Sequence, residues 1–229
     1  LANKNGASQA EAGLTVSEGM SVSARMRSVE TVEYQKDNGL GISVYFGKHK
    51  GTASTSSLDM ESIRKTVEAA CNIAKYTSED PCTGLADAEL MATEFAPLDL
   101  YHEWNISSDQ AIEMALECEA AALDFDTAIC NSEGASIDVG KGTSVYGNSH
   151  GFLQLERKTR HSISCSVVAE NEQGMQRDYW YDVSRDPARL QAVAELGQKA
   201  AIRALQRLGA KKLSTGKYPV MYAPEMARG

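Results

Sequence analysis

The 229-residue sequence contains no long apolar run and no apolar leader. A helix that crosses a membrane needs roughly 18 or more consecutive, mostly apolar residues, and no segment approaches that length. The first six residues, Leu1 to Gly6, are mostly polar and small and do not form the apolar region of a signal peptide. The sequence therefore predicts a cytoplasmic protein without a membrane segment.

Positive charge is also scarce and scattered. The 23 lysines and arginines are outnumbered by 31 acidic residues, which gives a net charge of -8, and only the segment 157–160 groups several cations. Binding to a phosphate backbone draws its affinity from clustered lysine and arginine. We therefore expect no direct nucleic-acid partner.

The five cysteines are odd in number and lack the Cys-x-x-Cys spacing of common zinc and redox motifs. Cys71, Cys118 and Cys165 occupy apolar positions of the predicted elements, where a reduced thiol packs as a small apolar group. We interpret these cysteines as reduced and structural.

One fragment matches the first half of a zinc-peptidase helix motif. His102 and Glu103 supply its first two residues, but Ile106 and Ser107 stand where the second histidine is needed. The segment 140–143 likewise departs from a phosphate-binding loop, and we interpret it as a turn between strands. We therefore predict no catalytic residue, no metal ligand and no cofactor within this segment.

Alternating apolar and polar residues predict an antiparallel meander over residues 14–56. Met20 and Val22, for example, share one side of an extended chain. The residues 37–39, Asp-Asn-Gly, tolerate positive φ and predict a hairpin turn into a strand over 40–46.

A second meander is predicted over residues 127–183. Its expected turns lie at 131–134, 140–142, 148–151 and 171–174, where glycine and asparagine gather. Apolar residues at helical spacing predict helices near 58–76, 107–124 and 187–209. Asp186 and Pro187 form the expected start of the last helix, because proline is tolerated at the first helical position. The fold class is therefore α+β, with antiparallel meanders packed against helices.

The segment 81–106 has no clear period and predicts a linker. It separates residues 1–80, a meander plus a helix, from residues 107–216, a helix, the second meander and a helix. Residues 218–222 predict the beginning of another strand. We therefore expect 217–229 to open a C-terminal domain that is absent here.

Several stretches resemble the TldD/PmbA family, described as modulators of DNA gyrase and as peptide-maturation metalloproteases. Residues 29–56 resemble the opening meander of that family. Residues 148–152, 175–181 and 218–225 resemble its PmbA (TldE) branch in particular. The match covers most of the chain and implies the N-terminal part of a PmbA-like fold.

The resemblance implies a zinc metalloprotease complex that acts in peptide maturation and in the degradation of small unfolded proteins. A TldD-type subunit would hold the zinc through a His-Glu-x-x-x-His motif, which a PmbA-type subunit lacks. This segment would be non-catalytic and would shape the surface for peptide and partner. For the assembly, a homodimer remains the alternative to a complex with a TldD-type subunit. For the function, the alternative is a non-proteolytic binding or regulatory protein such as a DNA gyrase modulator.

Two stretches are candidate contacts to a peptide or a partner subunit. The residues are Asn148, Phe152, Arg177, Tyr179, Trp180 and Tyr181. Amphipathic rings bury a large area while keeping a polar group, which suits such surfaces. The alternative for the first stretch is a plain hairpin turn with Phe152 in the core. The alternative for the second is strand packing, with Trp180 buried and the two tyrosines on the other face.

Overall fold

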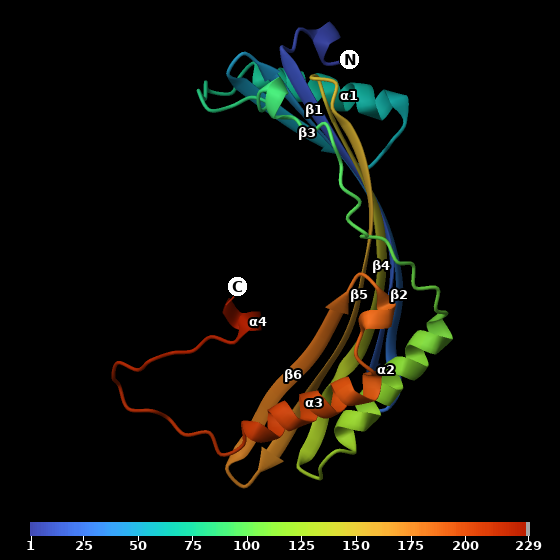
Figure 1. Ribbon diagram of the computed structural model, residues 1–229, viewed down its shortest axis with the longest axis vertical. Helices are drawn as coiled ribbons and strands as arrows, with labels where there is room; N and C mark the ends of the chain where they lie inside the picture. Colours follow the sequence, from blue (N-terminus) through green and yellow to red (C-terminus); the bar gives the residue numbers. More distant parts are fainter. Residues whose placement is uncertain (228–229) are drawn as a thin grey trace.

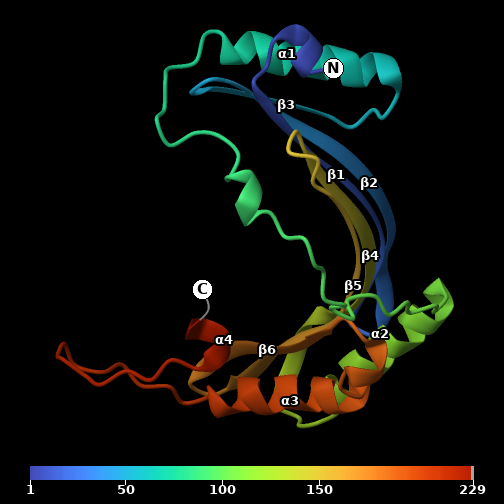
Figure 2. The same cartoon turned by 45° about the horizontal axis from the view of Figure 1, so that its top comes forward.

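The computed structural model describes residues 1–227, which form one curved antiparallel sheet with helices along its outer side (Figures 1 and 2). The strands are β1 (Gln9–Arg25), β2 (Ser28–Phe46), β3 (His49–Thr55), β4 (Ile129–Asn148), β5 (Leu153–Asn171) and β6 (Gly174–Ser184). Their order is β3-β2-β1-β4-β5-β6. Both predicted meanders are present, and the pairing of β1 with β4 joins them into a single sheet. The α+β class is thus confirmed.

The helices are α1 (Met60–Ala74), α2 (Ser108–Leu123), α3 (Val193–Gln206) and the short α4 (Pro224–Ala227), with single 3₁₀ turns at Asn3–Asn5, Ala88–Leu90 and Pro187–Arg189. The first two helices lie where the apolar spacing predicted them. Asp59 accepts two backbone N–H groups at the start of α1, and Ser107 and Gln110 form a capping box on α2. None of the helices in residues 1–227 is long and apolar enough to cross a membrane.

The predicted start of the third helix is wrong by six residues. Asp186 does accept the N–H of Ala188, but only the 3₁₀ turn at Pro187–Arg189 follows. The chain after this turn is extended because Gln191 makes two hydrogen bonds to β6. Its backbone N–H donates to the carboxylate of Asp182 (2.9 Å), and the side-chain oxygen of Gln191 accepts from the indole N–H of Trp180 (3.1 Å). These bonds hold the connection extended, so α3 begins at Val193.

The hairpin predicted at residues 37–39 is also wrong. Strand β2 runs straight through them, and the turn lies at Met26 and Arg27, whose φ angles are 49° and 63°. Left-handed backbone is costly for residues other than glycine. Here Glu119 of α2, with 0% of its surface exposed, accepts the N–H of Met26 (2.8 Å) and of Arg27 (2.7 Å). A helix 93 positions away in the sequence therefore stabilises this turn.

Two predicted turns lie inside β4, and one predicted strand is absent from the described chain. Residues 140–142 are in the middle of β4, and a Cβ at Gly140 would approach the backbone oxygen of Arg160 to 3.1 Å. The glycine permits close strand approach there rather than a turn. Residues 131–134 form irregularities within β4, whereas the turns near 149–151 and 172–173 are confirmed. Residues 218–222 form no strand, since they lie beside no other strand in the described chain.

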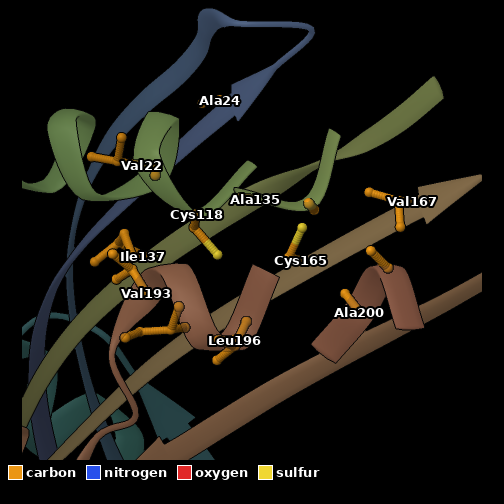
Figure 3. Close-up of a cluster of buried hydrophobic side chains, with 14 of the residues drawn as sticks. Val22, Ala24, Cys118, Ala135, Ile137, Cys165, Val167, Val193, Leu196 and Ala200 are labelled. Atoms are coloured by element: carbon orange, nitrogen blue, oxygen red, sulfur yellow. The ribbon is translucent and has the colours of Figure 1, made fainter. Parts of the chain in front are cut away.

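Two apolar clusters form the core on the outer face of the sheet. The larger one lies between the sheet and α2 and α3, and includes Val22, Ile137, Cys118, Cys165 and Leu196 (Figure 3). The smaller one lies under α1 and contains the buried Cys71. Cys71, Cys118 and Cys165 are buried and unpaired by disulfides, as predicted. The helices α1, α2 and α3 thus cover the two ends of one face. On the opposite face, linker residues Leu85 and Met91 reach Gln9 and Asn148.

Candidate functional site

The inner face of the sheet is lined by hydroxyl groups and glycines. Because side chains alternate along a strand, every second residue of each strand points to this face, opposite α1, α2 and α3 (Figure 2). On the three central strands these residues include Thr15, Ser17, Gly19, Ser21, Ser136, Asp138, Gly140, Gly142, Ser162, Ser164 and Ser166. The result is a polar, low-relief surface on the hollow side of the molecule.

A hydrogen-bonded carboxylate lies at the centre of this face. The hydroxyls of Ser21 and Ser162 donate to the two oxygens of Asp138, at 2.7 Å and 3.0 Å. The hydroxyls of Ser136 and Ser164 are hydrogen-bonded to each other at 2.8 Å. Since both carboxylate oxygens accept from serines, Asp138 ties three strands together. It has the surroundings of a structural group rather than of a general base.

The aromatic run on β6 divides between the two faces of the sheet. Tyr179 and Tyr181 lie on the inner face with 48% and 39% of their surface exposed, and their rings stack at 6.2 Å. Trp180 turns to the outer face, where the ammonium of Lys199 lies 3.6 Å from its ring centre. The tyrosines therefore present a surface, while Trp180 holds β6 against α3.

Arg177, the remaining candidate on β6, forms an ion pair with Glu133 at 2.8 Å. The Arg177 guanidinium, together with the hydroxyl of Ser166, holds the pKa of Glu133 below its ordinary value. The pair is exposed on both sides. Solvent screens exposed pairs of this kind, so the pair contributes little to the stability of the fold.

Asn148 and Phe152 lie at the opposite end of the sheet. Phe152 packs edge-on against Phe95 of the linker at 5.7 Å and lies 5.8 Å from the ring of Tyr146. Asn148 accepts the N–H of His150, as expected for a turn. Leu153 lies twelve positions before Cys165, the partner of Trp180, which corresponds to about 40 Å along an extended strand. The six candidates therefore form two separate surfaces.

An open apolar cavity of about 690 Å³ adjoins this turn on the outer face. Its walls come from the first residues, β1, β2, α1 and the β4–β5 hairpin. They include Leu1, Leu14, Leu40, Ile63, Val145, Phe152 and Leu153. Sequence reasoning did not predict this cavity or the serine-lined inner face. The alternation of Ser162, Ser164 and Ser166 is the signal that could have indicated the latter.

The half zinc motif takes part in structural contacts. Nε2 of His102 lies 3.1 Å from the backbone oxygen of Asp99, and Glu103 is paired with Lys141 at 3.0 Å. Within residues 1–227 no three histidine, cysteine or acidic side chains converge as they would around a metal ion. Whether the segment binds zinc stays a prediction for metal analysis.

Family models match both halves of the chain. The model described as PmbA/TldA metallopeptidase domain 1 matches residues 10–74, and that of the PmbA/TldA metallopeptidase central domain matches residues 101–208. The chain belongs to the PmbA/TldD family. The two matched regions meet where β1 pairs with β4, so the inner face of this PmbA/TldD chain is built from both of them.

Relatives extend the match over the whole chain. A metalloprotease PmbA homolog of Haemophilus influenzae is 48% identical over 229 residues, which are 100% of this chain and 51% of that protein. The metalloprotease PmbA of Escherichia coli O157:H7 is 47% identical over 220 residues, or 96% of this chain and 49% of that protein. The chain thus spans about half the length of these relatives.

Solved structures share the fold. A putative modulator of DNA gyrase from Bacteroides thetaiotaomicron superposes with a TM-score of 0.85 at 27% identity, covering 95% of this chain and 50% of that one. TldE from Thermococcus kodakarensis gives a TM-score of 0.74 at 18% identity, covering 89% of this chain and 45% of that one. The resemblance seen in the sequence is therefore confirmed at the level of family and fold.

Proposed function

We propose that this chain is the peptide- and partner-binding part of a PmbA-type subunit, acting in the cytoplasm. It works with a TldD-type subunit that carries zinc, in peptide maturation and in the degradation of small unfolded proteins. Membership of a metallopeptidase family supports peptide chemistry. The observation that carries the proposal is the hydroxyl-lined face that ends, beside Tyr179 and Tyr181, in the edge of β6, which has no strand partner in the described residues.

The strand edge supplies the binding chemistry. In the described residues β6 pairs with β5 alone, so its other edge has no strand partner. The N–H groups of Tyr179 and Val183 donate to the carboxylates of Asp178 and Asp182, at 2.8 Å and 2.9 Å, and a peptide that pairs with this edge would replace these bonds. Such an edge can pair with an extended peptide, and the alternating side chains then select its sequence. The stacked tyrosines offer apolar area and hydroxyl groups to side chains of that peptide. An unfolded segment, whose backbone groups are unpaired, is the ligand that this edge suits.

Catalysis is assigned to the partner in this proposal. The described residues contain no cluster that fits a metal ion, and His102 and Glu103 are engaged elsewhere. We therefore derive no chemical step from this chain. Its contribution is to bind and orient the peptide and to contact the TldD-type subunit.

Mixing experiments with full-length subunits test the proposal. We expect the protein to copurify with a TldD-type chain, and an unfolded peptide followed by mass spectrometry to be cleaved only when both chains are present. Chelators should abolish cleavage. Zinc-dependent cleavage by this protein alone would overturn the non-catalytic assignment. Failure to associate with any TldD-type chain would favour the regulatory alternative.

A pair of variants tests the binding surface. Tyr179→Ser with Tyr181→Ser should weaken peptide binding about tenfold, since hot-spot aromatics contribute about 1–2 kcal/mol or more at interfaces. Tyr76→Ser, which removes a ring with 91% of its surface exposed beyond α1, is the matched control and should leave binding unchanged. Equal peptide affinities for both variants would exclude β6 as the binding edge.

A further inference from the structure

Three cations meet on the inner face where β5 passes the end of β6. Lys158 and Arg160 are separated by one residue and both point to this face. Ser184 pairs with His161 in an antiparallel register, so the next residue, Arg185, lies opposite Arg160. All three side chains line one groove of about 600 Å³ on the inner face. We call Lys158, Arg160 and Arg185 the cationic triad.

The sequence alone did not indicate this grouping. Arg157, next to Lys158, points to the outer face, where its guanidinium lies 3.9 Å from the ring centre of Tyr101. The basic segment 157–160 is therefore divided between the two faces. Arg185 directly follows a different strand, β6, and lies 25 positions away from Arg160 in the sequence.

The triad is only partly neutralised by the described residues. Asp37 and Asp138 line the same groove, but Asp138 already accepts hydrogen bonds from two serines. Within residues 1–227, Arg160 and Arg185 form no ion pair, and Lys158 reaches only Glu156, at 3.6 Å. Arg185 instead donates to the backbone oxygen of Thr159 at 3.3 Å. Like charges directly opposite each other on neighbouring strands are destabilising. An anionic ligand would remove that repulsion.

The groove has room for an extended chain rather than for a globular surface. Gly19, Gly140 and Gly142 form part of its floor, so no side chain fills it there. Lys158 and Arg160 lie two residues apart on one strand, which places their Cα atoms about 6.6 Å apart. Alternate side chains of an extended peptide have the same spacing. The triad therefore matches a segment that carries carboxylates at every second position.

We propose that the cationic triad binds the carboxylates of an acidic, extended peptide segment that lies in the groove of the inner face. This rests on the proposed function, because it names the kind of peptide that the PmbA-type subunit takes. Tyr179, Tyr181 and Val183 precede Arg185 on the same face of β6. One extended chain along β6 can thus contact both the tyrosines and the triad. The net charge of -8 disfavours a nucleic acid as the occupant.

Binding of two labelled peptides to the full-length protein tests this. One peptide carries glutamate at alternate positions, and the other carries glutamine at the same positions. We expect the glutamate peptide to bind more tightly, and to lose affinity as salt rises. Arg160→Gln with Arg185→Gln should reduce the affinity for the glutamate peptide about fourfold to twenty-fivefold, at roughly two- to fivefold per exposed cation, and leave the glutamine peptide unaffected.

Two further variants separate charge from folding. Arg160→Lys keeps the charge and should keep the preference for glutamate. Lys65→Gln removes an exposed lysine of α1 and should change nothing. Equal affinities of the two peptides for the parent would overturn the triad proposal while leaving peptide binding, and so the proposed function, intact. A single-stranded oligonucleotide that competes better than the glutamate peptide would overturn the choice of ligand.

Discussion

The buried carboxylate of Glu119 is expected to control the turn that connects β1 and β2. It accepts the backbone N–H groups of Met26 and Arg27, at 2.8 Å and 2.7 Å, and has no exposed surface. In Glu119→Gln one amide oxygen can still accept, but the amide nitrogen faces an N–H group and cannot. One charge-assisted bond then becomes a neutral bond, and a second N–H is left without an acceptor.

The magnitude follows from these two losses. Bonds to charged groups contribute about 1.5–3 kcal/mol, neutral bonds about 0.5–1.5 kcal/mol, and an unsatisfied buried group costs about 1–3 kcal/mol. Together they predict a loss of about 2–4 kcal/mol in the free energy of unfolding. For a chain of this size that corresponds to a melting temperature lower by about 4–16 °C.

Thermal unfolding followed by circular dichroism is the assay. Glu117→Gln is the matched control, because Glu117 lies on the same helix with its side chain exposed. Its melting temperature should equal that of the parent. If Glu119→Gln also melts with the parent, the carboxylate does not hold the left-handed turn, and the explanation given for the position of this hairpin is wrong.

Three further predictions concern packing and pH. Gly51→Ala should lower the free energy of unfolding by about 1–3 kcal/mol in urea, since the added Cβ would lie 2.0 Å from a backbone oxygen of α1. Gly39→Ala is the control and should leave the free energy of unfolding unchanged, because its Cβ would meet nothing within 4 Å. Leu196→Asp should abolish cooperative unfolding, because the charge would be fully buried without a partner; an unchanged melting curve would contradict the position of α3. Burial raises the pKa of Glu11, but the hydroxyl of Tyr45 and further polar neighbours outweigh it and hold the pKa below its ordinary value. Glu11 should therefore stabilise the fold at pH values above its unfolded pKa of about 4.3, and this stabilisation should be lost as the pH falls through the lower pKa of the folded state. Tyr45→Phe should raise the pKa of Glu11 in an NMR titration.

The sequence alone predicted the features that depend on neighbours along the chain. The apolar spacing of α1 and α2 follows from the helical repeat, and Asp59 and Ser107 cap the helices that directly follow them. The alternation of apolar and polar residues in β1 and β5 predicted that these segments are strands and which side chains share a face, since the side-chain period of a strand is two. The family resemblance was likewise carried by short contiguous stretches.

Tertiary structure decided the features that depend on distant partners. The turn at Met26 exists because Glu119 reaches it, so the local signal at residues 37–39 had no effect. Gly140 lies inside β4 because a neighbouring strand approaches closely, which the sequence cannot distinguish from a turn. The pairing of β1 with β4 makes one sheet out of two local meanders. The pairing of β5 with β6 places Arg185 beside Arg160, because hydrogen bonds between strands connect residues that are separated in the chain.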